Sequence, residues 1–123
     1  MKLWEAILLG SQIRPQTFTR PFDDIGSCAW GAAWEAVGLR DWILSYGCNV
    51  EEKLIELGWL QVTDKAHTCP VCGYKEDGCA IAHLNDAHYW TRERIALEFV
   101  KPMEEALAVE AVAPAPVTEA VEA

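Results

Sequence analysis

The feature that most constrains this chain is a cluster of potential metal ligands between residues 69 and 88. The segment reads CPVCGYKEDGCAIAHLNDAH, so a Cys-x₂-Cys pair precedes two histidines. Two thiolates three positions apart can bind one ion at a tight turn, and the histidine spacing falls within the range found in finger helices. We therefore predict a structural zinc ion in a closed tetrahedral shell, with the ligands Cys69, Cys72, His83 and His88.

The residues around these ligands are typical of a zinc knuckle followed by a short helix. Pro70 restricts the turn between the cysteines, and Gly73 tolerates the positive φ that usually follows such a turn. Residues five apart on an ideal helix diverge by about 140°, so His88 can reach the ion only where the helix end loosens. Metal binding contributes about 10 kcal/mol of folding free energy to small zinc modules. We expect this module to fold only with its metal.

Two other interpretations of the cysteines stay open. In the main rival ligand set Cys79 replaces His88, giving Cys69, Cys72, Cys79 and His83; alternatively, Cys79 is a small buried residue. A Cys-x₂-Cys pair also occurs in thiol redox proteins, but the βαβ context that supports such a motif is not evident in this sequence. We expect Cys28 and Cys48 to be core thiols, and His67 to lie on the surface.

The rest of the sequence predicts a mainly α-helical protein with room for one domain and a small module. It has 123 residues, of which 51% are hydrophobic, and six tryptophans can supply much of a small core. Apolar residues recur at helical spacing in segments 3–13, 50–58 and 91–101, and residues 60–63 fit a short strand. Small residues and the pair Trp30 and Trp34 mark segment 28–38 as a buried central helix with Ser27 as its N-cap.

Composition predicts three regions along the chain. Residues 1–62 form a helical region, and residues 63–102 form the zinc module with a final helix that Thr91 caps and Pro102 stops. Residues 103–123 are almost wholly Ala, Val, Glu and Pro. We predict that this acidic segment is a disordered tail, with a frayed helical start at 103–112 as the exception.

Charge and motif content favour some classes of function over others. The formal net charge of −9 repels phosphate backbones, and the finger segment offers only Asn85 for reading bases, with Arg92 and Arg94 as the nearby cations. The sequence shows no nucleophile–base set, phosphate-binding loop or open metal position that would indicate an enzyme. We expect a structural or protein-interaction protein, with a nucleic-acid-binding zinc finger as the alternative.

The chain also lacks recognisable targeting signals. Its apolar N-terminal run is interrupted by Glu5, and no apolar stretch has the 18 residues that a membrane span needs. Five cysteines, two of them in Cys-x₂-Cys spacing, indicate metal binding in a reducing compartment. These features predict a cytoplasmic protein without membrane partners.

The segment HLNDAHYWTRERIA resembles the ending of a group of small, uncharacterised phage and bacterial proteins. These carry Cys-x₂-Cys followed by His-Leu-Asn-Asp-x-His-x-Trp-(Thr/Ser)-Arg-Glu-x-Ile-Ala. LWEAILLGSQIRPQ and SCAWGAAWEAVG resemble their N-terminal half, so the similarity covers most of residues 3–101 and leaves out the acidic tail. The resemblance implies the ligand set given above and a phage origin. A phage-encoded protein of this kind would be a virion component or a modulator of a host protein, in the virion or the host cytoplasm.

Overall fold

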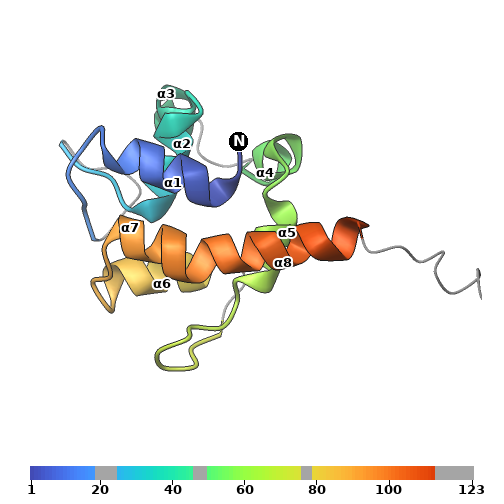
Figure 1. The fold of residues 1–123 in the computed structure, drawn as a ribbon. Coiled ribbons are helices and arrows are strands. Elements are labelled where there is room, and N and C mark those ends of the chain that lie inside the picture. Colours follow the sequence, from blue (N-terminus) through green and yellow to red (C-terminus); the bar gives the residue numbers. More distant parts are fainter. Residues whose placement is uncertain (19–24, 46–49, 76–78, 113–123) are drawn as a thin grey trace, which may run out of the picture.

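The computed structural model describes residues 1–18, 25–45, 50–75 and 79–112, and these residues are mainly helical (Figure 1). Within them the only β structure consists of two isolated bridges, Gln16 with Ser27 and Thr68 with Lys75. The mainly α fold class is therefore confirmed.

Helices α1 (Leu3–Ser11) and α2 (Ala29–Ala36) pack closely against each other. Gly10 permits this contact, because a Cβ atom at its position would overlap the backbone carbonyl of Ala32. The predicted central helix is confirmed, since five of its eight residues are buried. Its predicted N-cap is wrong by one position: the thiol of Cys28 accepts the capping bond from the Gly31 N–H, whereas Ser27 contacts Arg92.

Three short helices follow: α3 (Arg40–Ser45), α4 (Val50–Leu57) and α5 (Leu60–Lys65). The glycines that end α2 and α4, Gly38 and Gly58, have φ values of 78° and 77°, a conformation that glycine adopts without strain. The strand predicted for residues 60–63 is wrong, because these residues lie in α5. Burial of Trp59, Val62, Thr63 and Ala66 follows the i, i+3, i+4, i+7 pattern of a helix face.

The C-terminal half contains α6 (Cys79–Asp86), α7 (Arg92–Arg94), the π-helical segment η1 (Ile95–Val100) and α8 (Lys101–Val112). The last three form one continuous rod (Figure 1). The predicted N-cap is confirmed, since the Thr91 side chain accepts a hydrogen bond from the Arg94 N–H at 3.0 Å.

The prediction that Pro102 ends this helix is wrong. The Lys101 N–H donates to the carbonyl of Ala96, five residues back, so the hydrogen-bond pattern is already π-like when the chain reaches the proline. Proline destabilises an α-helix because its ring clashes with the carbonyl four residues earlier and it lacks an N–H. A wider π turn lessens both conflicts, so the helix continues.

The helical start predicted at 103–112 is confirmed, since these residues lie in α8, and residues 113–123 of the predicted tail lie outside the described part of the chain. A buried carboxylate fixes this helix. Glu104 accepts hydrogen bonds from the backbone N–H groups of Leu3 and Trp4, at 2.8 and 2.7 Å. Because the first N–H groups of a helix have no partner within that helix, Glu104 caps α1 from a position about one hundred residues later in the sequence.

One hydrophobic core joins residues on both sides of the predicted boundary at residue 62. Its largest members come from α1, α2, α5, α6 and the C-terminal rod: Leu3, Ile7, Trp34, Trp59, Ile81, Leu84, Ile95 and Val100. Trp34 and Trp59 are 5% and 1% exposed and lie 5.6 Å apart between ring centroids. The side chains of α6 that face away from the metal ligands thus belong to the same core as the N-terminal helices.

Candidate metal centre

The two cysteines lie on a tight turn that begins at Cys69. The Gly73 N–H donates to the Cys69 carbonyl at 3.0 Å, and the Cys69 N–H donates to the Tyr74 carbonyl at 2.7 Å. Gly73 has φ 78°, as its position in the sequence predicted. The Val71 N–H points at the Cys69 sulfur from 3.4 Å, which favours the thiolate form of that ligand.

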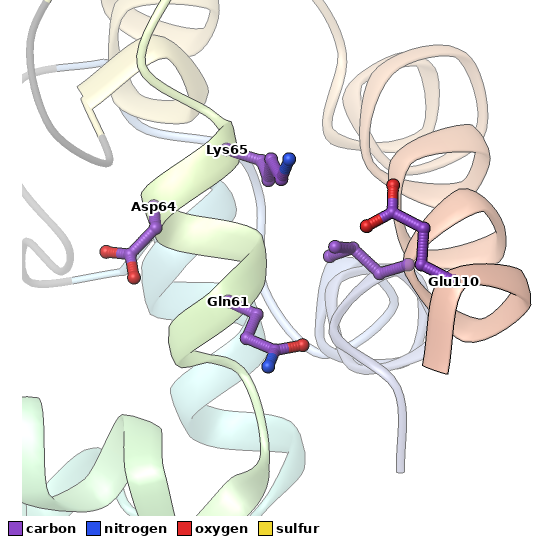
Figure 2. Close-up of a pocket in the computed structure, with 5 residues that line it drawn as sticks. Gln61, Asp64, Lys65 and Glu110 are labelled. Atoms are coloured by element: carbon purple, nitrogen blue, oxygen red, sulfur yellow. The ribbon is translucent and has the colours of Figure 1, made fainter. Parts of the chain in front are cut away.

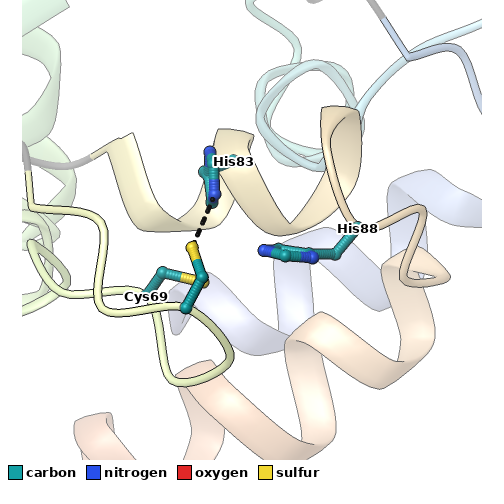
Figure 3. Close-up of side chains that lie close together, drawn as sticks. Cys69, His83 and His88 are labelled. Carbon is teal, nitrogen blue, oxygen red and sulfur yellow. Dashed lines mark hydrogen bonds between the residues drawn. The ribbon is translucent and has the colours of Figure 1, made fainter.

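The two histidines lie on α6 and just beyond its end. Ile81 and Leu84 are fully buried and fix the helix against the core, leaving His83 on its other side, toward the cysteines (Figure 3). The chain then reverses at Tyr89, whose φ is 54°, and the Trp90 N–H donates to the Leu84 carbonyl at 3.0 Å. The end of α6 loosens just before this reversal, as predicted: the His88 N–H donates to the His83 carbonyl, five residues back, at 3.3 Å, and this turn carries His88 close to His83.

The four predicted ligands come together in space. One ligand atom from each of Cys69, Cys72, His83 and His88 lies within 4.8 Å of all the others. The Cys72 sulfur lies 3.3 Å from His83 Nε2, and the two imidazole rings meet edge to face with centroids 4.9 Å apart. Figure 3 shows the side chains of Cys69, His83 and His88 pointing toward one another.

This arrangement fits a tetrahedral metal ion. Zinc–sulfur bonds of about 2.3 Å and zinc–nitrogen bonds of about 2.0–2.1 Å place neighbouring ligand atoms about 3.3–3.8 Å apart. The observed group is slightly wider and would contract around an ion. The Nε2 atom of His88 is buried and has no hydrogen-bond partner among the described residues. A buried polar nitrogen without a partner is destabilising, and a metal ion would satisfy it.

The four candidate ligands differ in their exposure to solvent. Cys69 is buried, both histidines are partly buried, and Cys72 is exposed. Asp86, one turn after His83 on α6, accepts a hydrogen bond from Asn85 Nδ2 at 2.7 Å. Burial raises the pKa of the Asp86 carboxyl, while this hydrogen bond and the nearby His83 oppose the rise. Because Cys72 is the exposed member of the group, solvent reaches the centre from its side.

The other predicted cysteines and histidine do not join this group within the described residues. Cys28 is buried at the start of α2, and burial raises the pKa of its thiol, so the prediction of a core thiol is confirmed. His67 is exposed, as predicted, and lies 2.9 Å from the hydroxyl of Thr68. Cys48 and the side chain of Cys79 lie outside the described part, so the rival ligand set stays a prediction.

Two polar residues that the nucleic-acid alternative would need at the surface are instead buried. Asn85 is fully buried; its side-chain oxygen accepts from Gln16 Nε2 and the Ala29 N–H, and its nitrogen donates to the Thr17 carbonyl. Arg92 is 5% exposed and donates to Ser27 and to the carbonyls of Ser11 and Arg14. Neither side chain is available to bases or phosphates. Their polar character alone gave no signal of burial in the sequence.

A separate groove lies between α5 and α8 (Figure 2). It encloses about 400 Å³ and is lined by Gln61, Asp64, Lys65, Leu107 and Glu110. Figure 2 shows the side chains of Lys65 and Glu110 directed into it from opposite helices. None of the predicted metal ligands lines this groove, and its polar lining consists of one amide, one ammonium and two carboxyl groups.

Comparison of the chain with protein-family models, with curated proteins and with solved structures finds no match. In the described part of the chain, no helix combines the length and the apolar character needed to cross a membrane.

Proposed function

We propose that this chain is a zinc-stabilised structural or protein-interaction protein. The observation that carries the proposal is the convergence of two sulfurs and two imidazole nitrogens within 4.8 Å, together with the unpartnered buried Nε2 of His88. The structure supports a metal-binding group, and the identity of the metal is inferred from the chemistry of its ligands.

Zinc fits this ligand set better than other common divalent metals. Two thiolates exclude the hard cations magnesium and calcium, which prefer oxygen ligands, and a four-coordinate shell of sulfur and nitrogen is typical of structural zinc. Two thiolates neutralise the ion, and neutral imidazoles add no charge. With four protein ligands no coordination position remains for a substrate, so the ion stabilises the fold.

A protein partner is favoured over a nucleic acid. The net charge of −9 repels phosphates, and both Asn85 and Arg92 are buried in the fold. The third nearby polar candidate, Arg94, stacks on Trp90 and pairs with Glu98 at 3.1 Å. The resemblance of residues 3–101 to phage and bacterial proteins implies a phage origin, and for a phage-encoded chain we propose the role of a virion component or a modulator of a host protein.

The metal assignment is tested by zinc content per chain in purified protein. We expect one zinc in the wild-type protein and in the control His67→Ala, whose histidine is exposed and outside the ligand group. Cys69→Ser and His88→Ala each remove one of the four ligands and should lower zinc content well below one per chain. Normal zinc content in both ligand variants would reject the proposal.

The partner class is tested in two assays with the zinc-loaded full chain. In a pull-down from host lysate or from purified virions, we expect a protein to be retained by the wild-type chain and lost with His88→Ala. In a gel-shift assay with DNA and RNA at low salt, we expect no retardation. Metal-dependent retardation without protein capture would instead support the nucleic-acid alternative.

A further inference from the structure

One ligand ring in the metal centre is held by a neighbouring aromatic ring. The rings of Tyr74 and His83 stack with centroids 4.5 Å apart and an interplanar angle of 13°. Tyr74 belongs to the turn that carries the cysteines, whereas His83 belongs to α6. The contact therefore connects the turn that carries the cysteines directly to α6. The stacking of the two rings does not require a bound metal.

The backbone of Tyr74 is fixed relative to the first cysteine. Its carbonyl accepts the Cys69 N–H at 2.7 Å, and the adjacent residues Thr68 and Lys75 form an antiparallel bridge. A ring on such a constrained turn has little freedom to leave His83. Stacking against it restricts the imidazole rotation that would carry Nε2 away from the Cys72 sulfur, 3.3 Å distant.

Tyr74 also lies on the solvent side of the centre. Cys69 is 2% exposed and His88 Nε2 is buried, whereas Cys72 is exposed and Tyr74 is 43% exposed. Water or a competing chelator therefore approaches the metal beside Cys72, next to His83, whose ring the tyrosine covers on one face. Loss of the ring would uncover His83 at this edge.

We propose that Tyr74 is a positioning residue of the metal centre, which holds the His83 imidazole in its ligating orientation and slows exchange of the bound ion with solvent. This inference rests on the proposed zinc site and adds a residue outside the ligand set. Residues that orient metal ligands typically change metal affinity by about 10- to 100-fold when they are replaced. We expect Tyr74→Ala to release zinc about 10-fold faster than the wild-type protein.

The test measures zinc transfer from the loaded full chain to excess chelator, with a colorimetric zinc indicator in a stopped-flow instrument. Tyr74→Phe keeps the ring and should release zinc at the wild-type rate. Val71→Ala is the control, because Val71 lies on the same turn and its side chain is 53% exposed.

Cobalt substituted for zinc supplies a spectroscopic reading of the site. We expect its ligand-field bands to shift in Tyr74→Ala and to stay unchanged in Tyr74→Phe and Val71→Ala.

The outcomes separate this inference from the zinc site itself. A wild-type chain that binds no zinc would overturn both, whereas a loaded wild-type chain whose release rate and cobalt spectrum match those of Tyr74→Ala would overturn only the role of Tyr74. If circular dichroism shows that Tyr74→Ala is unfolded, Tyr74→Leu replaces it, since leucine covers the site without a stacking plane. Equal release from the Leu and Phe variants would then contradict the stacking mechanism.

Discussion

At the scale of single residues, we expect Gly10 and Arg92 to tolerate substitution poorly, because backbone atoms or hydrogen-bond acceptors surround them closely. At Gly10, α1 and α2 approach so closely that the backbone of Ala32 occupies the place of a Cβ atom. The guanidinium of Arg92 is surrounded by hydroxyl and carbonyl acceptors. Gly10 lies on the contact between α1 and α2, whereas Arg92 connects the N-terminal segment to the start of the C-terminal rod.

Gly10→Ala should destabilise the protein, although alanine is the better helix former. Propensity alone favours alanine by about 1 kcal/mol, but the added methyl group must displace the α2 backbone, which cannot rotate away. Overpacking of this kind typically costs about 1–3 kcal/mol, so we expect a net loss in urea unfolding of the zinc-loaded protein. Leu9→Ala is the control on the same helix, because Leu9 is 45% exposed. An unchanged or increased midpoint for Gly10→Ala would contradict the close packing.

Arg92→Lys should be strongly destabilising despite retaining the charge. The two terminal nitrogens of Arg92 donate to acceptors on Ser27, Ser11 and Arg14, a spread that one ammonium group cannot cover. Burial lowers the pKa of Arg92, so the cation depends on these acceptors. Unsatisfied buried groups cost about 1–3 kcal/mol each, and we expect a loss in that range or above it. Arg94→Lys, at the exposed neighbour, should change the urea midpoint little; equal effects would contradict the argument.

At the scale of elements, the spacing of apolar residues predicted most helices. Its errors lie where contacts between residues far apart in the sequence determine the structure. Segments 3–13 and 50–58 were recognisable because their apolar residues recur at helical spacing. Helix α5 was mistaken for a strand because Val62 and Thr63 are β-branched, and only the burial of Trp59 and Ala66 in the fold reveals its helical face. A helical start was predicted at 103–112, but its continuity with the preceding helix was not, because the Ala- and Glu-rich sequence shows no apolar stripe and its anchor, Glu104, acts on α1.

Glu104 therefore supports a prediction about the contact between α1 and α8. Glu104→Ala leaves the N–H groups of Leu3 and Trp4 without their acceptors, and loss of a helix cap costs about 0.5–2 kcal/mol. The control is Glu105→Ala, since Glu105 is exposed on the same helix. We expect a lower urea midpoint and weaker hydrogen-exchange protection of the first turn of α1 in Glu104→Ala only. Equal protection in both variants would contradict the capping role.

The same carboxyl should give stability a characteristic pH dependence. Burial raises the pKa of Glu104 above its ordinary value of 4.5, against the opposing effect of the two N–H donors. The folded state then holds this proton more tightly than the unfolded state, so the contribution of Glu104 grows as pH falls from neutral toward the ordinary pKa. Relative to Glu104→Gln, which cannot ionise, the wild-type protein should gain unfolding free energy between pH 7 and pH 4.5. Both proteins are measured in excess zinc and compared where both stay zinc-loaded, so that the pH dependence of metal binding cancels in this difference; a constant difference would contradict the raised pKa.

At the scale of the whole molecule, the sequence predicted the cluster of two cysteines and two histidines better than it predicted how this cluster joins the fold. Cys-x₂-Cys and His-x₄-His are local patterns with a direct chemical meaning, so the group could be identified without coordinates. The role of Asn85 could not, because its partners Gln16, Thr17 and Ala29 lie far away in the sequence. Tyr74 was missed for a similar reason, since its stacking partner is on another element.

Asn85 lies between the two histidines in the sequence. The same turn of the chain therefore carries the candidate ligands and the side chain that binds the start of α2. The Asn85 side chain binds the N–H of Ala29, the first residue of α2, while Ile81 and Leu84 on α6 belong to the core that contains Trp34 and Trp59. Removal of the metal would free His88 and loosen the end of α6. Because no separate N-terminal core exists among the described residues, the loosening should extend to α1 and α2.

We therefore expect chelation to unfold the molecule in one transition, with helix loss in far-ultraviolet circular dichroism coinciding with a red shift of tryptophan emission. Trp34 and Trp59 are buried in α2 and beside α5, so their emission reports on the N-terminal half. Cys69→Ser should show the unfolded spectra without chelator, and His67→Ala should behave as the wild-type protein does. Had the predicted boundary at residue 62 separated two independent units, the chelator would remove helix signal and leave the emission of the buried tryptophans unchanged. We expect the shared core to make the metal a requirement for folding of both halves, since the free energy of binding would be spread over every element that packs on α6.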